Sequence, residues 1–354
     1  MSNAADKTSN PQGPQLNQIL IYAGIAWGIS ALLFFLWFSI TIPGEEERPV
    51  WYSIGTYIFE EFAFLGAAIF CFRNWRSPQI VSGRNVWLGL CLGMAFYFLG
   101  TILFGYWELV EGLNPEISLG DFFFIATYIS VGWGMVLAVL SRKLNLELWQ
   151  WSITIVIAIA GIALAVWLWI SAPVDNNQNA ANEESPQPNI EEVKPTANKN
   201  QKVPEKKAPD IPPNAKSKTP TTVKTQKSEV TKEDAKSSNW VTDVENFLQP
   251  LKTPVNFFYI VADVFLLIIA TTLLLAFWGG RFALSWRMIA AAAFCFYIGD
   301  SWFKYATDHI ENYQSGFLLE VFWVFSGVLF AIGAILEYDT SSRVTRPGVR
   351  KRAK

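Results

Sequence analysis

Apolar residues in this chain are concentrated in long runs of twenty or more. About 20 helical residues span the roughly 30 Å hydrocarbon layer of a membrane. Lipid offers the backbone no hydrogen-bond partners, so such segments have to be helices rather than open strands. The pattern predicts an all-α fold, a polytopic membrane helical bundle with eight transmembrane helices: 19–42, 50–72, 86–107, 119–140, 148–170, 257–278, 283–305 and 316–338.

The connections between these spans alternate in charge. The connection 43–49 is acidic, the next is rich in arginine, and the alternation continues to the basic tail 339–354. Lys and Arg favour the cytoplasmic side of a membrane. We therefore expect the N-terminal tail 1–18 and the C-terminal tail to be cytoplasmic. We expect the membrane to be a bacterial plasma membrane, or a thylakoid if the organism is photosynthetic, with the acidic loops facing the periplasm or lumen.

The stretch 171–239 interrupts the pattern. It is rich in Lys, Pro, Asn, Ser, Thr and Glu and holds no aromatic residue, so it cannot form a packed core. We predict a disordered extracytoplasmic linker, which serves as a plain tether or contacts the cell wall or another periplasmic protein. The following segment 240–251 places its apolar residues on one helical stripe, which predicts a short helix lying on the outer membrane interface.

One phrase occurs twice in the chain, "FYFLGTILFGY" at 96–106 and "CFYIGDSWFKY" at 295–305. A shift of 199 residues keeps aromatic residues, glycines and an acid in register, and one span earlier a shift of 202 pairs Glu61 with Asp263. We predict two parallel four-helix repeats, 19–140 and 148–170 together with 257–338, related by an axis along the membrane normal. Residues matched by the shift of 199 include Trp87 with Trp286, Gly100 with Gly299, Phe104 with Phe303, and Asp121 with Glu320.

Carboxyl groups lie inside several of these spans. A carboxylate at the centre of a bilayer costs about 2.5–3.5 kcal/mol, so it normally faces protein or water. By the predicted topology all these acids lie toward the outer side, which predicts a cleft that opens there and binds a ligand or a proton. Adjacent residues cannot point the same way on a helix, so we expect either Glu60 or Glu61 to face lipid or another subunit of an oligomer. The candidates are Glu60, Glu61, Asp121, Asp263, Asp300 and Glu320.

Structural roles remain open for the same acids. Asp121 and Glu320 stand where helices begin, and an acid there is favoured by the helix dipole without any ligand. Asp300 could pair with Lys304 one turn later on the same helix. Glu61 and Asp263 have no basic residue in their own spans, which favours a functional role for them.

Composition excludes several classes of protein. The chain has 354 residues, of which 51% are hydrophobic and 16% charged, and its net charge of −2 gives no reason to expect nucleic acid. A single histidine, His309, rules out bis-histidine haem and a Ser-His-Asp triad within one chain. Cys71, Cys91 and Cys295 all fall in apolar runs without zinc spacing. We expect no metal and no cofactor.

The run "PEISLGDFFFIATY" at 115–128 resembles the multi-pass membrane sensor modules that precede diguanylate cyclase (GGDEF) or histidine kinase domains in bacteria. The span from Trp87 to Gly100, the helix with Tyr259 and Asp263, and the span near Asp300 are similar to further elements of those modules. In this chain a threonine replaces an expected aspartate after Gly100, and the long outer insert is foreign to them. No output domain follows the last span, so the resemblance implies a sensor module that works alone or through a separate partner.

Four functions remain open. The first is a membrane sensor or adaptor, whose tail 343–354 contacts anionic lipid or a cytoplasmic signalling partner. The second is an ion-coupled transporter, because parallel repeats with facing acids suit alternating access. The third is a scaffold or assembly factor that acts through the linker and the tail. An enzyme is the least favoured, because no nucleophile, metal set or phosphate loop accompanies the acids.

Overall fold

The described part of the chain is built from helices and their connections, with no strand among them. The structure, a computed structural model, describes residues 12–39, 48–112, 117–140, 146–171, 239–278, 282–310 and 313–345. These residues form one compact unit. The helices are α1 (Gln12–Phe38), α2 (Val50–Arg76), α3 (Arg84–Leu109), α4 (Leu119–Leu140), α5 (Leu148–Ser171), α7 (Asn239–Leu248), α8 (Lys252–Ala276), α9 (Ala283–His309) and α10 (Val321–Thr345), with short 3₁₀ turns at Gln249–Leu251 and Leu318–Glu320.

Seven helices in the described part are long and apolar enough to cross a membrane. This confirms the prediction of an all-α, multi-pass membrane protein. The helix α9 forms where a further span was predicted, but it is not among these seven, and it carries Arg287, Asp300, Lys304 and Asp308. Much of α9 is packed against other helices, which keeps alanines such as Ala290 and Ala292 fully buried.

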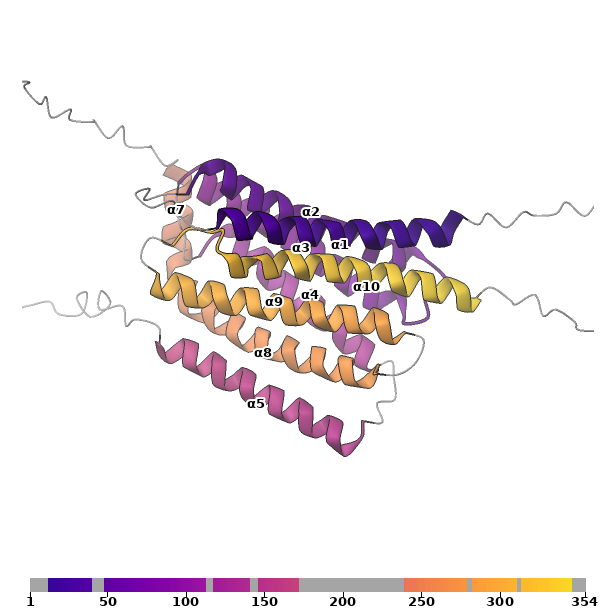
Figure 1. Cartoon of the computed structure of the whole chain (residues 1–354). Helices are drawn as coiled ribbons and strands as arrows, with labels where there is room; N and C mark the ends of the chain where they lie inside the picture. The colour runs from indigo at the N-terminus through magenta and orange to yellow at the C-terminus, as the bar shows by residue number, and fades with distance from the viewer. Residues whose placement is uncertain are drawn as a thin grey trace, which may run out of the picture. The chain divides into compact units, whose positions relative to one another are not determined.

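Six of the long helices form a closed ring. Going round it, α2 packs on α3, α3 on α4, α4 on α8, α8 on α9, α9 on α10, and α10 back on α2. Two helices lie outside the ring: α1 packs on α10 and α2, and α5 packs on α8 and α9 (Figure 1). In α1 and α5 only 17% and 22% of the apolar window is buried, against 67% in α10, so these outer helices present most of their surface to lipid.

Along the helix axes, one half of the bundle is filled by large aromatic side chains and by close helix contacts. Trp87 and Trp286 are fully buried with ring centroids 6.3 Å apart, and Phe277 stacks on Trp286 at 4.9 Å. The helices α3 and α4 touch at Gly89 and Gly134, where a Cβ on Gly89 would lie 2.7 Å from the Gly134 Cα. Small residues of this kind let membrane helices approach closely and pack tightly.

Several helices extend beyond the apolar runs that predicted them. Helix α1 begins at Gln12 instead of residue 19, α8 begins at Lys252 instead of residue 257, and α2 continues to Arg76 instead of residue 72. Hydropathy marks only the part of a helix that lies in hydrocarbon, and polar turns at its ends can continue the same helix outside.

Some predicted segments lie outside the described residues. These are all but the ends of the linker 171–239, most of the acidic connection 43–49, residues 1–11 of the first tail, and residues 346–354 of the last tail.

The predicted short helix before α8 is present as α7. Its Trp240 contacts the end of α3, with ring centroids 5.3 Å from Trp107 and 6.4 Å from Tyr106, and Val241 is fully buried. Phe247 is 77% exposed. Figure 1 shows α7 running across one end of the long helices. An apolar side chain left open at this place suits a helix that lies on the membrane interface.

The contact between α3 and α4 gives a test of the packing. We expect Gly89→Ala to lower the free energy of unfolding by about 1–3 kcal/mol, because the new methyl group overlaps Gly134 and the Ser130 carbonyl oxygen. Gly66→Ala on α2 is the matched control, since no described atom lies within 4 Å of its added Cβ. Thermal unfolding in detergent should show a lower Tm for the first variant and an equal or higher one for the second. Equal losses in both would contradict the packing described.

Candidate functional site

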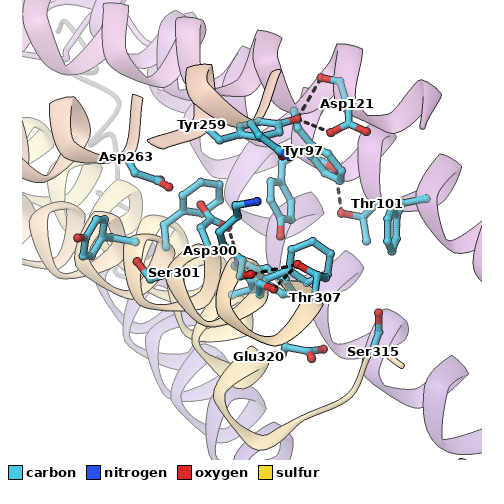
Figure 2. A pocket seen from close by; sticks show the side chains of 18 of the residues that line it. Tyr97, Thr101, Asp121, Tyr259, Asp263, Asp300, Ser301, Thr307, Ser315 and Glu320 are labelled. Atoms are coloured by element: carbon cyan, nitrogen blue, oxygen red, sulfur yellow. Dashed lines mark hydrogen bonds between the residues drawn. The ribbon is translucent and has the colours of Figure 1, made fainter. Parts of the chain in front are cut away.

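A cavity of about 460 Å³ lies inside the ring, in the half of the bundle along the helix axes that does not hold Trp87 and Trp286. It lies at the end where α3, α5 and α9 finish and where α4, α8 and α10 begin. Figure 2 shows side chains from several of these helices facing the same space. Five of the six acids predicted from the sequence line this cavity: Glu60, Asp121, Asp263, Asp300 and Glu320.

Two of these acids share one tyrosine. The Tyr128 hydroxyl on α4 lies 2.6 Å from Asp263 Oδ1 on α8 and 2.5 Å from Asp300 Oδ2 on α9. Asp300 also accepts the indole N–H of Trp323 on α10 at 2.7 Å. Three helices of the ring therefore meet through a single hydroxyl group, and a fourth is tied in by the indole.

Glu60 accepts a hydrogen bond from the neighbouring helix. The Tyr97 hydroxyl on α3 donates to Glu60 Oε1 at 2.6 Å. The Tyr97 ring is held in place because it stacks on Phe64 at 3.8 Å between centroids. The carboxyl group on α2 is thus fixed against α3.

Asp121 has both a structural and a cavity-facing role. The backbone N–H of Ser118 donates to Asp121 Oδ2 at 2.6 Å, which ties the carboxyl to the start of α4. Its other oxygen, Oδ1, accepts the Tyr259 hydroxyl from α8 at 2.6 Å (Figure 2). The helix-start interpretation of this acid therefore holds together with a cavity position.

Glu320 is bound in a similar way at the start of α10. It accepts the backbone N–H of Gly316 at 2.6 Å and of Phe317 at 3.1 Å, together with the Tyr313 hydroxyl. Burial raises the pKa of Tyr313 well above its usual value, and the nearby Glu320 carboxyl raises it further. Tyr313 therefore stays protonated and remains a donor.

The loop that carries these groups is pinned by the start of α2. The Tyr52 hydroxyl donates to the Gly316 carbonyl at 2.6 Å, and Arg48 donates to the Ser315 carbonyl at 2.9 Å. Gly316 has φ of +108°, and a Cβ there would lie 2.7 Å from the Tyr52 ring. Only glycine fits this conformation and this space. The loop is a fixed part of the cavity rim.

The floor of the cavity is aromatic and tightly packed. Phe296 has its ring centroid 5.3 Å from Tyr97, 5.5 Å from Tyr128 and 6.4 Å from Phe64. Beneath Phe296 the next void measures about 10 Å³, close to the space of one water molecule. In this conformation the cavity thus ends about halfway along the bundle.

Two lysines line the cavity beside the acids. Lys304 pairs with Asp308 at 3.1 Å. The alternative considered above, a pair between Lys304 and Asp300, is wrong, because Asp300 is bonded to Tyr128 and Trp323 instead. Lys252 at the start of α8 also contributes to the wall.

Glu61 is the predicted site residue that does not line the cavity. Both of its carboxylate oxygens are buried, and neither has a hydrogen-bond partner among the described residues. Adjacent residues lie about 100° apart around a helix, so only one of the two neighbouring glutamates can face the cavity. On α2 and α8 the acids that line the cavity are Glu60 and Asp263.

Sequence reasoning assigned none of the tyrosines that bind these acids to the site, although Tyr259 was named beside Asp263. Tyr128 follows Asp121 by seven residues and Tyr259 precedes Asp263 by four, so each lies on the same helix face as an acid. A tyrosine four or seven residues from an acid within an apolar span was the signal in the sequence that could have identified these partners. The pairing across helices depends on packing that spacing alone cannot give.

The arrangement can bind a ligand and hold protons, and it offers no obvious metal centre. Among the described residues, no group of three or more His, Cys, Asp or Glu side chains is placed to hold a metal ion. The three cysteines are free thiols in or beside the packed core.

The shared tyrosine is the part of the site that packing depends on most. We expect Tyr128→Phe to lower the free energy of unfolding by about 1–3 kcal/mol, because it leaves two carboxyl groups without their common partner. Tyr106→Phe is the control: it removes an exposed hydroxyl that donates to Glu111 at 2.9 Å and should change Tm little. Tyr128→Phe with an unchanged Tm would show that the hydroxyl does not hold the helices together.

The comparisons with known proteins name no family for this chain. No protein-family model matches it, and no curated protein and no solved structure matches it either. Its function has to be argued from the cavity and the acids around it.

Proposed function

We propose that this protein is an integral membrane sensor or adaptor that binds a small molecule in the acidic cavity. One observation carries the proposal: five of the six predicted acids, which lie far apart in the sequence, line one cavity of about 460 Å³. That volume lies within the range of small-molecule sites in proteins. Acids within membrane spans are rare and usually mark a binding or proton site.

Binding without transport is favoured by what lies under the cavity. Phe296 forms its floor, the void below is only about 10 Å³, and α3 and α4 touch there at Gly89 and Gly134. A transporter needs a path to the other side, and such a path would have to open through this closely packed half. Transport remains the alternative because the predicted repeats suit alternating access.

Contacts between equivalent residues support the two predicted repeats. Under the shift of 199, Trp87 corresponds to Trp286 and Phe104 to Phe303, and the members of each pair touch, at 6.3 Å and 6.1 Å between ring centroids. Residues next to a twofold axis meet their own equivalents in this way.

A second pair of contacts agrees with this relation. Gly100 packs against the Phe124 ring, and its counterpart Gly299 packs against the Trp323 ring, with 124 and 323 again 199 apart. The outer helices α1 and α5 would be the first helices of the two halves.

We further propose that the cavity opens to the periplasm or lumen and that both termini are cytoplasmic. The cavity lies at the end of the bundle where the acidic connections were expected to face outward. As in the sensor modules that the sequence resembles, a ligand would enter from outside and alter helix packing. A cytoplasmic signalling partner or anionic lipid would then read the change at the basic tail. A scaffold that acts through linker and tail would leave the cavity without a role.

Thiol labelling tests the orientation. In a variant with Cys71, Cys91 and Cys295 changed to serine, Thr307→Cys places a thiol at the cavity wall, where Thr307 is exposed. A membrane-impermeant maleimide should label it from outside intact cells. Gln79→Cys, exposed in the connection at the other end, should be labelled only in inverted vesicles. The reverse result would place the cavity on the cytoplasmic side.

Binding and transport can be separated on purified protein in lipid. We expect a member of a panel of amino acids, polyols, nucleosides, carboxylates and amines to raise Tm in nanodiscs. Ser301→Phe fills the cavity wall and should abolish that rise, whereas Ser152→Phe on the exposed face of α5 should not. Spin labels at residues 79 and 152 should then report a ligand-dependent distance change.

Flux of the bound compound into proteoliposomes would favour the transporter instead. A Tm rise that survives in the Ser301→Phe variant would contradict the proposed site.

A further inference from the structure

The balance of charge in the cavity favours a cationic ligand. An anionic ligand would add its charge to an excess of acids, whereas a cation would offset it. Lys304 is already engaged with Asp308 at 3.1 Å. The lining contains the carboxyl groups of Glu60, Asp121, Asp263, Asp300, Asp308 and Glu320 against the two ammonium groups of Lys252 and Lys304.

The two contacts that join Asp263, Tyr128 and Asp300 need one more hydrogen atom than the Tyr128 hydroxyl supplies. The tyrosine hydroxyl lies 2.6 Å from one carboxyl and 2.5 Å from the other. A phenol carries a single proton and can donate it to only one of them. The second contact joins two acceptor oxygens unless a further hydrogen is present. That hydrogen is a proton on one of the two carboxyl groups, and a cationic donor brought by a ligand could replace its positive charge.

Aromatic rings surround this group and would suit the rest of such a ligand. Phe296 and Tyr97 form the floor, and Phe124 lies beside them, 5.4 Å from Tyr97 between centroids. The faces of aromatic rings attract cations and also accept hydrocarbon. A cavity of about 460 Å³ is far larger than a bare ion needs, and the described residues present no three-ligand metal set.

We propose that the cavity binds a small organic amine in its protonated form, with the ammonium group placed between Asp263 and Asp300. The ammonium group then donates to both carboxylates and replaces the proton that one of the two carboxyl groups carries, while Tyr128 keeps its own proton and donates it to one of them. That proton leaves to solvent through the open end of the cavity, so charge balances. The hydrocarbon part of the amine contacts Phe296 and Tyr97. This assignment rests on the proposed function, because it names the ligand class of the same cavity.

Other charged or titratable groups near the carboxyl pair are compatible with the exchange. No described arginine lines the cavity, and the two lysines there are the cations that the amine would join. The titratable side chains that interact electrostatically with Asp263, Asp300 or both come from four helices. They are Glu60 on α2, Tyr97 on α3, Tyr259 on α8 and Tyr297 on α9. Asp121 on α4 and Glu320 on α10 line the same space.

Three probes of the same shape and different charge test the assignment. Isothermal titration of the full chain in nanodiscs would compare 2-phenylethylamine, 2-phenylethanol and phenylacetate at pH 7. We expect the amine to bind and the other two to bind at least about tenfold more weakly, because a charge-assisted hydrogen bond is lost in each. The heat of amine binding should differ between phosphate and Tris buffers, since one proton is released for each amine bound.

Matched variants locate the charge. Asp263→Asn and Asp300→Asn should each weaken amine binding by about tenfold or more. Glu111→Gln removes a carboxyl that also accepts a tyrosine hydroxyl but lies outside the cavity, and it should leave binding unchanged. If an asparagine variant fails to fold, the three probes on the unmodified chain still decide.

Each contrary result has a definite meaning. Equal binding of the alcohol or the acid would overturn the cationic class while leaving a ligand-binding cavity in place. Equal heats in the two buffers would show that no shared proton is displaced and would overturn the exchange. If none of the three probes binds, the amine assignment fails. The panel screen with Ser301→Phe then separately decides whether the cavity binds any ligand.

Discussion

Tyrosine hydroxyls hold the predicted carboxyl groups around the cavity, whereas Glu61, outside it, has no hydrogen-bond partner among the described residues. Each of the five predicted acids in the cavity lies at hydrogen-bond distance from a tyrosine hydroxyl, and four of these contacts cross from one helix of the ring to another. Tyrosine suits this role because its ring packs with apolar neighbours while its hydroxyl reaches a polar partner. The same contacts that make the acids tolerable in the membrane also hold the helices around the cavity.

The two predicted halves do not contribute equally to the cavity. Position 101 is threonine where position 300 is aspartate, and position 97 is tyrosine where position 296 is phenylalanine. The first half therefore places a donor on its third helix, whereas the second half places an acid.

Much of the fold could be predicted from the sequence because lipid imposes few solutions on an apolar run. Eight helices form at the predicted places, and their ends differ because polar end turns carry no apolar signal. The acids were found for the same reason, since each stands out in its span. Glu61 was chosen as the partner of Asp263 because a short match favoured a shift of 202. One residue of slip turns a helix by about 100°, so that choice selected the wrong face.

The pinned rim and the packed floor limit how the protein can respond to an occupied cavity. The loop at Gly316 is fixed by Tyr52 and Arg48, and the void below Phe296 measures only about 10 Å³. Closely packed interiors switch between discrete arrangements and deform little in a continuous way. A change at the cavity is therefore expected as a tilt of α3 against α4 about their close contact at Gly89 and Gly134. Because Gly134 lies six residues from Tyr128 and six from Leu140, the far end of α4 would move by about as much as its tyrosine in the cavity.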